Sequence, residues 1–144
     1  MTRANVELVL ALQLGPDVDL ARLFRDAHVS AAPTGAATQH FHADFECVHH
    51  LLGGERTYTG FDGLRESWLD WLAPWATYRA ETEEAIDCGD RVLLLVRDFG
   101  RREAGSPEVR SDNAAIWTIR DAKVARAEFY ADRDWARKDA GLQG

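Results

Sequence analysis

The stretch TYRAETEEAIDCGDRVLLLVRDFGR, residues 77–101, decides the fold class, because its residue spacing is typical of strands and not of helices. Its second half begins with five consecutive apolar residues, VLLLV at 92–96, which indicate a strand covered on both faces. The sequence CGDR between the halves contains glycine and aspartate, which favour turns. Residues 77–101 therefore predict a long antiparallel hairpin.

Two further strands and a helix are expected after this hairpin. The runs VRSDNAAIWTI (109–119) and VARAEFYA (124–131) are joined by the turn RDAK and extend the hairpin into a meander. Asp132 follows directly, and its side chain can accept hydrogen bonds from the first amides of a helix over 132–140, which Gly141 would end. We therefore expect Asp132 to be a structural cap and not a catalytic carboxylate.

The first part of the chain has mainly helical spacing. Apolar residues recur at helical intervals over 4–14 and again over 20–27, with Asp17 or Asp19 available to cap the second helix. The small and polar residues SAAPTGAATQ (30–39) indicate a loop. A strand, and then a turn with a short extended piece, are predicted for FHADFECVHHLL (41–52) and GGERTYTG (53–60).

The segment SWLDWLAPW, residues 67–75, places three tryptophans in one predicted helix. Asp62 is the expected cap of this helix, and Phe61 is the apolar residue packed against its first turn. Pro74 either kinks the helix or ends it, and in the second case Trp75 lies just beyond the last turn. At about 100° per residue, one narrow stripe of the helix carries Leu64, Trp68, Trp71 and Trp75. Aromatic area of this size belongs either to the core or to the wall of a ligand cavity.

Length and composition fit one globular domain. The 144 residues are 46% hydrophobic and 28% charged, and helices followed by antiparallel strands indicate a single α+β domain, residues 1–144. The formal charge of −7 argues against nucleic acid as a partner. The run VELVLALQL is too short to span a membrane, is interrupted by Glu7 and lacks the features of a signal peptide. With only Cys47 and Cys88 as thiols, we expect a cytoplasmic protein with reduced cysteines.

Four segments resemble the SnoaL-like branch of the nuclear transport factor 2-like superfamily. They are RTYTGFDGLRESW (56–68), EEAIDCGDRVLLLVRDFGR (83–101), AIWTIRDAKVARAEFYADR (115–133) and AGL (140–142). With the two N-terminal helices, the resemblance covers nearly the whole chain. It implies a curved antiparallel sheet wrapped around a long helix, with a cone-shaped pocket for a small hydrophobic molecule. It also implies a homodimer without a metal or another cofactor.

The same resemblance gives the tryptophans an expected place. The tryptophan helix would cross the cone, with Trp71 or Trp75 in contact with the cavity and Trp68 in the core. The superfamily includes isomerases, cyclases, dehydratases, epoxide hydrolases and non-enzymes, so the fold alone does not select a reaction. Phe129 stands where the epoxide hydrolases carry an aspartate on the last strand, which argues against that mechanism.

The faces of the last two strands depend on their pairing. If Ile119 lies opposite Val124 across the RDAK turn, one face carries Asn113, Ala115, Trp117, Arg126, Glu128 and Tyr130. The other face then carries Ala114, Ile116, Ala125, Ala127 and Phe129. This apolar face is either the core or a dimer surface, and a bulge in either strand would change both sets.

The polar set has two readings. If it points into the cone, Glu128 is a general base, Tyr130 and Asn113 are donors to a developing oxyanion, and Trp117 forms part of the wall. If it points to solvent, Arg126 and Glu128 form an exposed ion pair. We favour the cone, because aromatic side chains are costly to leave on an exposed sheet face.

Asp98 is the other candidate base. Arg97 and Asp98 follow the apolar run of their strand and must point to opposite faces, so only one of them can enter the cone. Asp98 buried among apolar side chains would have a raised pKa and would suit proton abstraction. The alternative is a residue at the rim of the cone.

The histidines are weaker candidates. Four residues that alternate along the predicted strand and are typical of metal ligands are His40, His42, Asp44 and Glu46. The pair of histidines lacks a third ligand at a fixed spacing, so we prefer polar surface positions to a metal site. His49 or His50 could act as an acid or base at the pocket mouth, and Tyr58 either lines the pocket or is packed in the core.

Two classes of function remain open. The first is an enzyme without a cofactor that isomerises, cyclises or dehydrates an apolar cyclic or carbonyl compound, with Asp98 or Glu128 as the base. The second is a non-catalytic protein, either a carrier of a hydrophobic metabolite or a homodimeric interaction module. A buried carboxylate close to a hydrogen-bond donor favours the enzyme, and an entirely apolar cavity favours the carrier.

Overall fold

The computed structural model describes residues 2–25, 37–51 and 54–142. Its elements are α1 (Thr2–Leu12), α2 (Leu20–Arg25), a 3₁₀ turn (Ala37–His40), β1 (Phe41–Leu51), β2 (Gly54–Thr59), α3 (Gly60–Leu72), β3 (Thr77–Cys88), β4 (Arg91–Arg101), β5 (Val109–Arg120), β6 (Lys123–Tyr130) and α4 (Arg133–Asp139). Each predicted helix and strand has a counterpart here, with ends shifted by a few residues. Ala27, most of the predicted loop at 30–39, and residues 52–53 lie outside the described residues.

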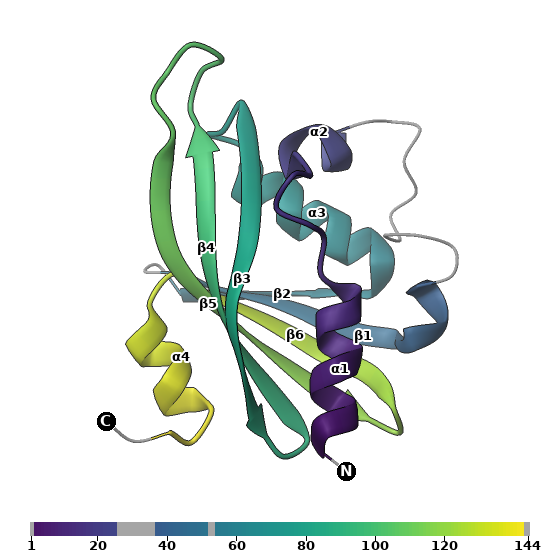
Figure 1. Cartoon of the computed structure of the whole chain (residues 1–144). Helices are drawn as coiled ribbons and strands as arrows, with labels where there is room; N and C mark the ends of the chain where they lie inside the picture. The colour runs from purple at the N-terminus through teal and green to yellow at the C-terminus, as the bar shows by residue number, and fades with distance from the viewer. Residues whose placement is uncertain (1, 26–36, 52–53, 143–144) are drawn as a thin grey trace.

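The described strands form one sheet in the order β2-β1-β6-β5-β4-β3. Neighbouring strands are antiparallel except β1 and β6, which are parallel. The sheet is strongly curved, with α1, α2 and α3 on its concave side and α4 on the opposite side (Figure 1). The predicted fold, an α+β domain with a curved sheet wrapped around a helix, is confirmed.

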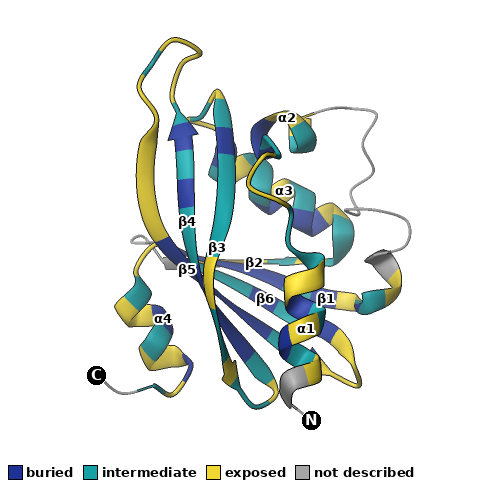
Figure 2. Cartoon of the chain, viewed as in Figure 1, coloured by how far each residue is buried: buried dark blue, intermediate teal, exposed yellow. Residues whose placement is uncertain are grey.

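Apolar side chains cover both faces of the sheet. The inner layer, between the concave face and helices α1 and α3, includes Val6, Val9, Phe41, Phe45, Leu64, Leu94, Trp117 and Ala127. The outer layer, between the sheet and α4, is made of Leu93, Leu95, Ala114, Ile116, Tyr130, Ala136 and Ala140. Buried residues therefore follow one another along the central strands, as the apolar run of β4 predicts (Figure 2).

A bulge in β6 sets the faces of the last two strands. Ile119 lies opposite Val124, as predicted, but Thr118 lies opposite Arg126. Ala125 is therefore an extra residue in β6, and every later residue of this strand points to the face opposite to the predicted one.

The predicted face assignment is wrong beyond this bulge. The residues that share the concave face are Asn113, Ala115, Trp117, Ala127 and Phe129. Glu128 lies opposite Ile116, and Tyr130 lies opposite Ala114, on the outer face beneath α4. The bulge thus separates the two candidate catalytic residues of β6 from the cone.

A second bulge, in β3, determines which side chains of this strand point to the concave face. A register shift between Thr82 and Glu84 inserts one extra residue into the strand. Beyond it, Ala80 lies opposite Asp98, so Tyr78, two residues earlier, points to the same face as Asp98. Without the bulge, Arg79 and Glu81 would occupy that face instead.

Only the N-terminal end of α3 differs from the prediction. The helix begins at Gly60, which has a φ of +72°, and its N-cap is Thr59, whose side chain makes no capping hydrogen bond. The prediction of Asp62 as the cap is wrong. Asp62 lies in the first turn, where a negative charge is favourable. The helix ends at Leu72, two residues before Pro74, as expected.

The cap of α4 is confirmed. The Asp132 carboxylate accepts hydrogen bonds from the backbone amides of Asp134 at 2.8 Å and Trp135 at 3.2 Å. This arrangement satisfies two of the free amides at the helix start. None of the described helices combines the length and the apolar character needed to cross a membrane.

Trp75 packs against the backbone of β4 at Gly100. A Cβ atom at Gly100 would lie 2.5 Å from Cε3 of Trp75. The indole ring also makes an edge contact with Tyr78, with ring centroids 5.7 Å apart, and lies under the Arg102 guanidinium. Only glycine allows this close approach of a ring to the strand.

Replacing Gly100 by alanine tests this packing. The added methyl group would push the Trp75 ring away from β4, so Gly100→Ala should lower the free energy of unfolding by about 1–3 kcal/mol. Urea denaturation followed by circular dichroism measures the change. Gly105→Ala is the matched control, because a Cβ atom there meets no heavy atom within 4 Å. Equal stability of the two variants would contradict the contact.

Candidate functional site

A cavity of about 120 Å³ lies on the concave side of the sheet. Its wall is formed by α3, by β1, β3, β4, β5 and β6, and by α2 together with the segment that joins α1 to α2. The polar residues of the wall are Gln13, Thr82, Asp98 and Asn113. The remaining lining residues are apolar, aromatic or glycine, so a ligand would leave water almost completely on binding.

Both tryptophans of α3 line this cavity. Trp68 and Trp71 are both lining residues, and Trp68 stacks on Phe24 of α2 with the ring planes 8° apart. Trp68 therefore belongs to the wall, contrary to the expectation that it is only core. Trp75 lies beyond the end of α3, against Gly100, and does not line the cavity.

The Asp98 carboxylate is the central polar group of the cavity. Asp98 is only 6% exposed, and its Oδ2 accepts hydrogen bonds from Tyr78 Oη at 2.5 Å and from Asn113 Nδ2 at 2.7 Å. No described residue bonds to its Oδ1. Burial raises the pKa of Asp98, and the two hydrogen bonds and the positive charge of Arg133 offset part of that rise.

Tyr78 is the site residue that sequence reasoning missed. Trp71 Nε1 donates to Tyr78 Oη at 3.0 Å, and Tyr78 Oη in turn donates to Asp98, so the three side chains form a chain of hydrogen bonds. Burial and the adjacent Asp98 raise the pKa of Tyr78 well above its usual range, which keeps the phenol protonated. The bulge in β3 aims Tyr78 at Asp98, and the bulge has no sequence motif that would have predicted it.

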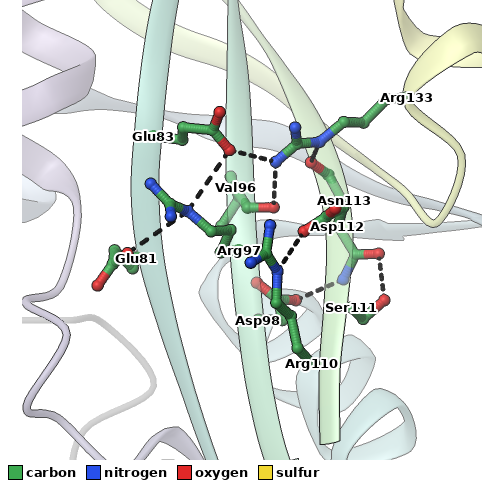
Figure 3. A network of polar contacts seen from close by, with 10 residues as sticks. All are labelled: Glu81, Glu83, Val96, Arg97, Asp98, Arg110, Ser111, Asp112, Asn113 and Arg133. Atoms are coloured by element: carbon green, nitrogen blue, oxygen red, sulfur yellow. Dashed lines mark hydrogen bonds and ion pairs between the residues drawn. The ribbon is translucent and has the colours of Figure 1, made fainter.

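Asn113 is oriented from two directions. Ser111 Oγ donates to Asn113 Oδ1 at 2.8 Å, so the amide group turns its Nδ2 toward Asp98. From the outer face, Arg133 of α4 donates to the backbone carbonyls of Asn113 at 3.1 Å and Val96 at 3.0 Å (Figure 3). The start of α4 thus fixes the two strands that carry Asp98 and Asn113.

Arg133 is itself held in a charged network on the outer face. Its Nη2 also contacts Glu83, the glutamate of the β3 bulge, at 3.0 Å, and Arg97 lies between Glu81 and Glu83 at 3.5 Å from each (Figure 3). Arg97 and Asp98 therefore point to opposite faces, as the strand geometry predicts, and Asp98 is the one that enters the cone.

Glu128 and Tyr130 belong to a different group of residues on the outer face. Glu128 accepts hydrogen bonds from His50 Nε2 at 2.9 Å and from Tyr130 Oη at 3.1 Å, and Tyr130 Oη lies 2.9 Å from Asp139 of α4. The Tyr130 ring stacks on His50. Tyr130 borders the cavity, but its hydroxyl group is directed to α4, so the predicted trio of Asp98, Glu128 and Tyr130 is not brought together.

His49 and Tyr58 are not lining residues either. His49 is buried among Trp68, Trp71 and Phe129, and neither ring nitrogen has a partner in the described part of the chain. Burial lowers the pKa of His49 to about 4, so this ring is neutral near pH 7. Tyr58 packs against the inner layer and donates to an exposed aspartate of α3 at 2.8 Å.

Trp117 does line the cavity, as predicted. It is 8% exposed, and its ring contacts the edges of Phe41 and Phe129. Among the described residues, its Nε1 has no hydrogen-bond partner. A buried donor without a partner is rare in folded proteins.

Of the two histidines near the start of β1, His42 has a structural partner. His40 ends the 3₁₀ turn and His42 lies in the strand, where its ring nitrogen is 2.6 Å from the carbonyl of Arg120. Within the described ranges, no three His, Cys, Asp or Glu side chains are grouped so that they could hold a metal ion. Cys47 and Cys88 are both free thiols.

Several solved structures have the same architecture. TerC, crystallised with polyporic acid, is 24% identical over 96% of this chain and 98% of its own, with a TM-score of 0.61. A candidate SnoaL-like polyketide cyclase from Jannaschia sp. CCS1 is 15% identical over 99% and 94%, with a TM-score of 0.61. A phenazine biosynthesis-related protein from Pseudomonas aeruginosa is 14% identical over 99% and 88%, with a TM-score of 0.58. At these identities the similarity shows the fold alone.

The family is established by a separate comparison of the sequence with family models. A search of curated proteins found no match. The model of the SnoaL-like domain, in contrast, matches residues 21–127, which is most of the chain and includes every strand up to the middle of β6. The protein therefore belongs to the SnoaL-like domain family.

Proposed function

We propose that this protein binds a small, mostly apolar cyclic or carbonyl compound in the cone and moves a proton on it with Asp98. The observation that carries the proposal is the Asp98 carboxylate, buried at the cavity wall with one oxygen held by two donors and the other without a described partner. The reaction is an isomerisation, cyclisation or dehydration that needs no cofactor.

Asp98 is suited to act as a general base. Its Oδ1 would take a proton from a carbon next to a carbonyl group, and return it to a second carbon of the ligand. Burial in an apolar wall raises the pKa of the carboxyl, which makes its ionised form a stronger base. Tyr78 and Asn113 hold Oδ2, so the free oxygen keeps one orientation during the transfer.

The solved structures give independent support for a small-molecule role. One is crystallised with polyporic acid, and another carries the name of a polyketide cyclase. Proteins of this fold therefore include one with a small-molecule ligand, although these neighbours differ from this chain at most positions. A compound of related chemistry is the first kind of ligand to test.

A non-catalytic carrier is the second candidate function. The observation that favours it is the composition of the cavity wall, in which only four polar residues interrupt an apolar and aromatic surface. Both functions require ligand binding, and only the enzyme requires the free oxygen of Asp98. Substitution of this residue separates them.

The proposal includes a cytoplasmic homodimer, as the sequence suggested. The apolar residues of β5 that were candidates for a dimer surface, Ala114 and Ile116, are packed beneath α4 of the same chain. A dimer would therefore use another surface. Analytical ultracentrifugation would measure the state of assembly.

The variant Asp98→Asn tests whether Asp98 is the general base. The amide has the shape of the carboxylate and can still accept from Tyr78 and Asn113, but it cannot take a proton. With 2-tetralone, a two-ring ketone, as the probe, the wild type should accelerate deuterium uptake at the carbons next to the carbonyl. The variant should be slower by at least about 100-fold, the usual contribution of a general base. Proton NMR in heavy water measures the exchange.

The control for this experiment is Asp112→Asn, which removes an exposed carboxylate of β5 outside the cavity. It should leave both binding and exchange unchanged. Equal exchange rates in the wild type and in Asp98→Asn would exclude Asp98 as the base. Binding of 2-tetralone without any acceleration by the wild type would favour the carrier.

For the same variant, Asp98→Asn, we predict a stability relative to the wild type that changes with pH. Because burial raises the folded-state pKa of Asp98 above its ordinary value of 3.8, the folded protein binds this proton more tightly than the unfolded chain. The wild type therefore loses stability as the pH rises above 3.8, and Asp98→Asn does not undergo this loss. The stability of the variant relative to the wild type should increase between pH 4 and pH 7.

Urea denaturation at the two pH values measures this difference. A relative stability that is constant or falls with pH would mean that the hydrogen bonds from Tyr78 and Asn113 outweigh the cost of burying the charge. Asp112→Asn again serves as the comparison. Because Arg110 lowers the pKa of this exposed carboxyl, the stability of Asp112→Asn relative to the wild type should change with pH in the opposite direction.

A further inference from the structure

We propose that the Thr82 hydroxyl group is the polar anchor of the cavity, where it donates a hydrogen bond to the carbonyl oxygen of a ligand with a single ring. This proposal rests on the proposed function, since it concerns the same cavity, but the binding of the ligand does not require Asp98 to act as a base. It adds a binding residue, the functional group that this residue recognises and the size of the ligand.

Thr82 lies in the wall of the cavity beside the other polar residues. It is in β3 opposite Val96 of β4, which in turn lies opposite Asn113 of β5. Asp98 is two residues beyond Val96 on the same face, so Thr82 and Asp98 are diagonal neighbours with Cα atoms about 7–8 Å apart. An oxygen atom bound at Thr82 therefore lies in the same part of the cavity as Asp98.

The hydroxyl group of Thr82 is accessible and unpaired. Thr82 is only half-buried, and within the described ranges its side chain makes no hydrogen bond. Among the described residues, the unpartnered polar side-chain atoms that packing covers completely all belong to other residues. A ligand in the cavity can therefore reach the Thr82 oxygen, which has one hydrogen to donate.

Other polar side chains of the wall already have partners in the chain. Gln13 donates to a backbone carbonyl of α1 at 2.9 Å. Asn113 accepts from a serine of its own strand and donates to Asp98. These side chains are held by bonds within the protein, whereas a hydrogen bond from Thr82 to a ligand displaces none of them.

The volume and the apolar wall of the cavity define the rest of the ligand. The volume of about 120 Å³ is comparable with the roughly 150 Å³ of an apolar cavity that binds benzene. Since most of the wall is apolar or aromatic, it favours a hydrocarbon ring with a single oxygen substituent. Burial of that oxygen is then not penalised, because Thr82 replaces the water that was bonded to it.

The same hydroxyl group supplies a donor that the proposed reaction otherwise lacks. The sequence suggested Tyr130 and Asn113 as donors to the developing oxyanion, but Tyr130 is directed to α4 and Asn113 donates to Asp98. When a proton leaves the carbon next to the carbonyl for Asp98, the C–H electron pair forms a carbon–carbon double bond and the carbonyl electron pair moves onto oxygen. A hydrogen bond from Thr82 stabilises that negative charge.

Thr82→Val tests the anchor, because it removes the hydroxyl group and keeps the branched shape of the side chain. The probes are cyclohexanone and methylenecyclohexane, in which a CH₂ group replaces the carbonyl oxygen. Each Kd is measured by NMR titration, from the shifts of the indole N–H signals of Trp68 and Trp71 in the cavity wall. The variant should bind cyclohexanone about three- to tenfold more weakly, the effect of one neutral hydrogen bond, and methylenecyclohexane within about twofold of the wild type.

Two further variants are the controls. Thr82→Ser restores a hydroxyl group and should recover most of the affinity for cyclohexanone. Thr118→Val removes the hydroxyl group of a half-buried residue of β5 outside the cavity, and both Kd values should stay unchanged. In heavy water, Thr82→Val should also slow deuterium uptake by bound cyclohexanone by about 100-fold, the usual loss for one oxyanion donor.

The outcomes separate this proposal from the proposed function. Equal weakening of both probes by Thr82→Val, or no weakening of either, would overturn the anchor and leave Asp98 as the candidate base. A selective loss of affinity for cyclohexanone, without deuterium uptake by the wild type, supports the anchor and counts against the base. If cyclohexanone does not bind the wild type, the anchor is overturned, and the Asp98→Asn experiment decides separately about the base.

Discussion

The buried carboxylate of Asp98 is the constraint on which the candidate site depends. A carboxylate that is 6% exposed is unfavourable unless donors surround it, and two donors reach it from the strands on either side of β4. Tyr78 in β3 and Asn113 in β5 are held in turn by Trp71 and Ser111. Three adjacent strands and α3 are therefore tied together around one carboxylate, and Asp98 lines a mostly apolar cavity.

The two bulges decide which side chains reach the cavity. Since successive residues of a strand alternate between faces, one extra residue reverses every position beyond it. In β3 this brings Tyr78 to the side of Asp98, and in β6 it takes Glu128 away and brings Phe129 in. The cone consequently has one buried carboxylate and an aromatic wall, and the acidic residue of β6 forms hydrogen bonds on the outer face.

The C-terminal helix connects the outer face to the site. Arg133, its first residue, donates to the backbone carbonyls of Val96 and Asn113, directly behind the strand positions that carry the polar groups of the cavity. Farther along the same face, Tyr130 bonds to Asp139 of α4. The helix thus covers the apolar outer layer and, at the same time, fixes the spacing of β4 and β5 at the site.

The sequence by itself determined the elements and the α+β class, because turn chemistry, helix spacing and the apolar run of β4 act over a few residues. The curved sheet around a helix was what the resemblance to the SnoaL-like branch implied. The cap at Asp132 and the pairing of Ile119 with Val124 followed from the same local signals. The tertiary structure alone decided the faces beyond the bulges, and with them the partnership of Tyr78 and Asp98. A bulge is selected by packing between strands and by distant groups such as Arg133, which contacts the bulged Glu83 from α4. No local pattern in the sequence predicts that contact.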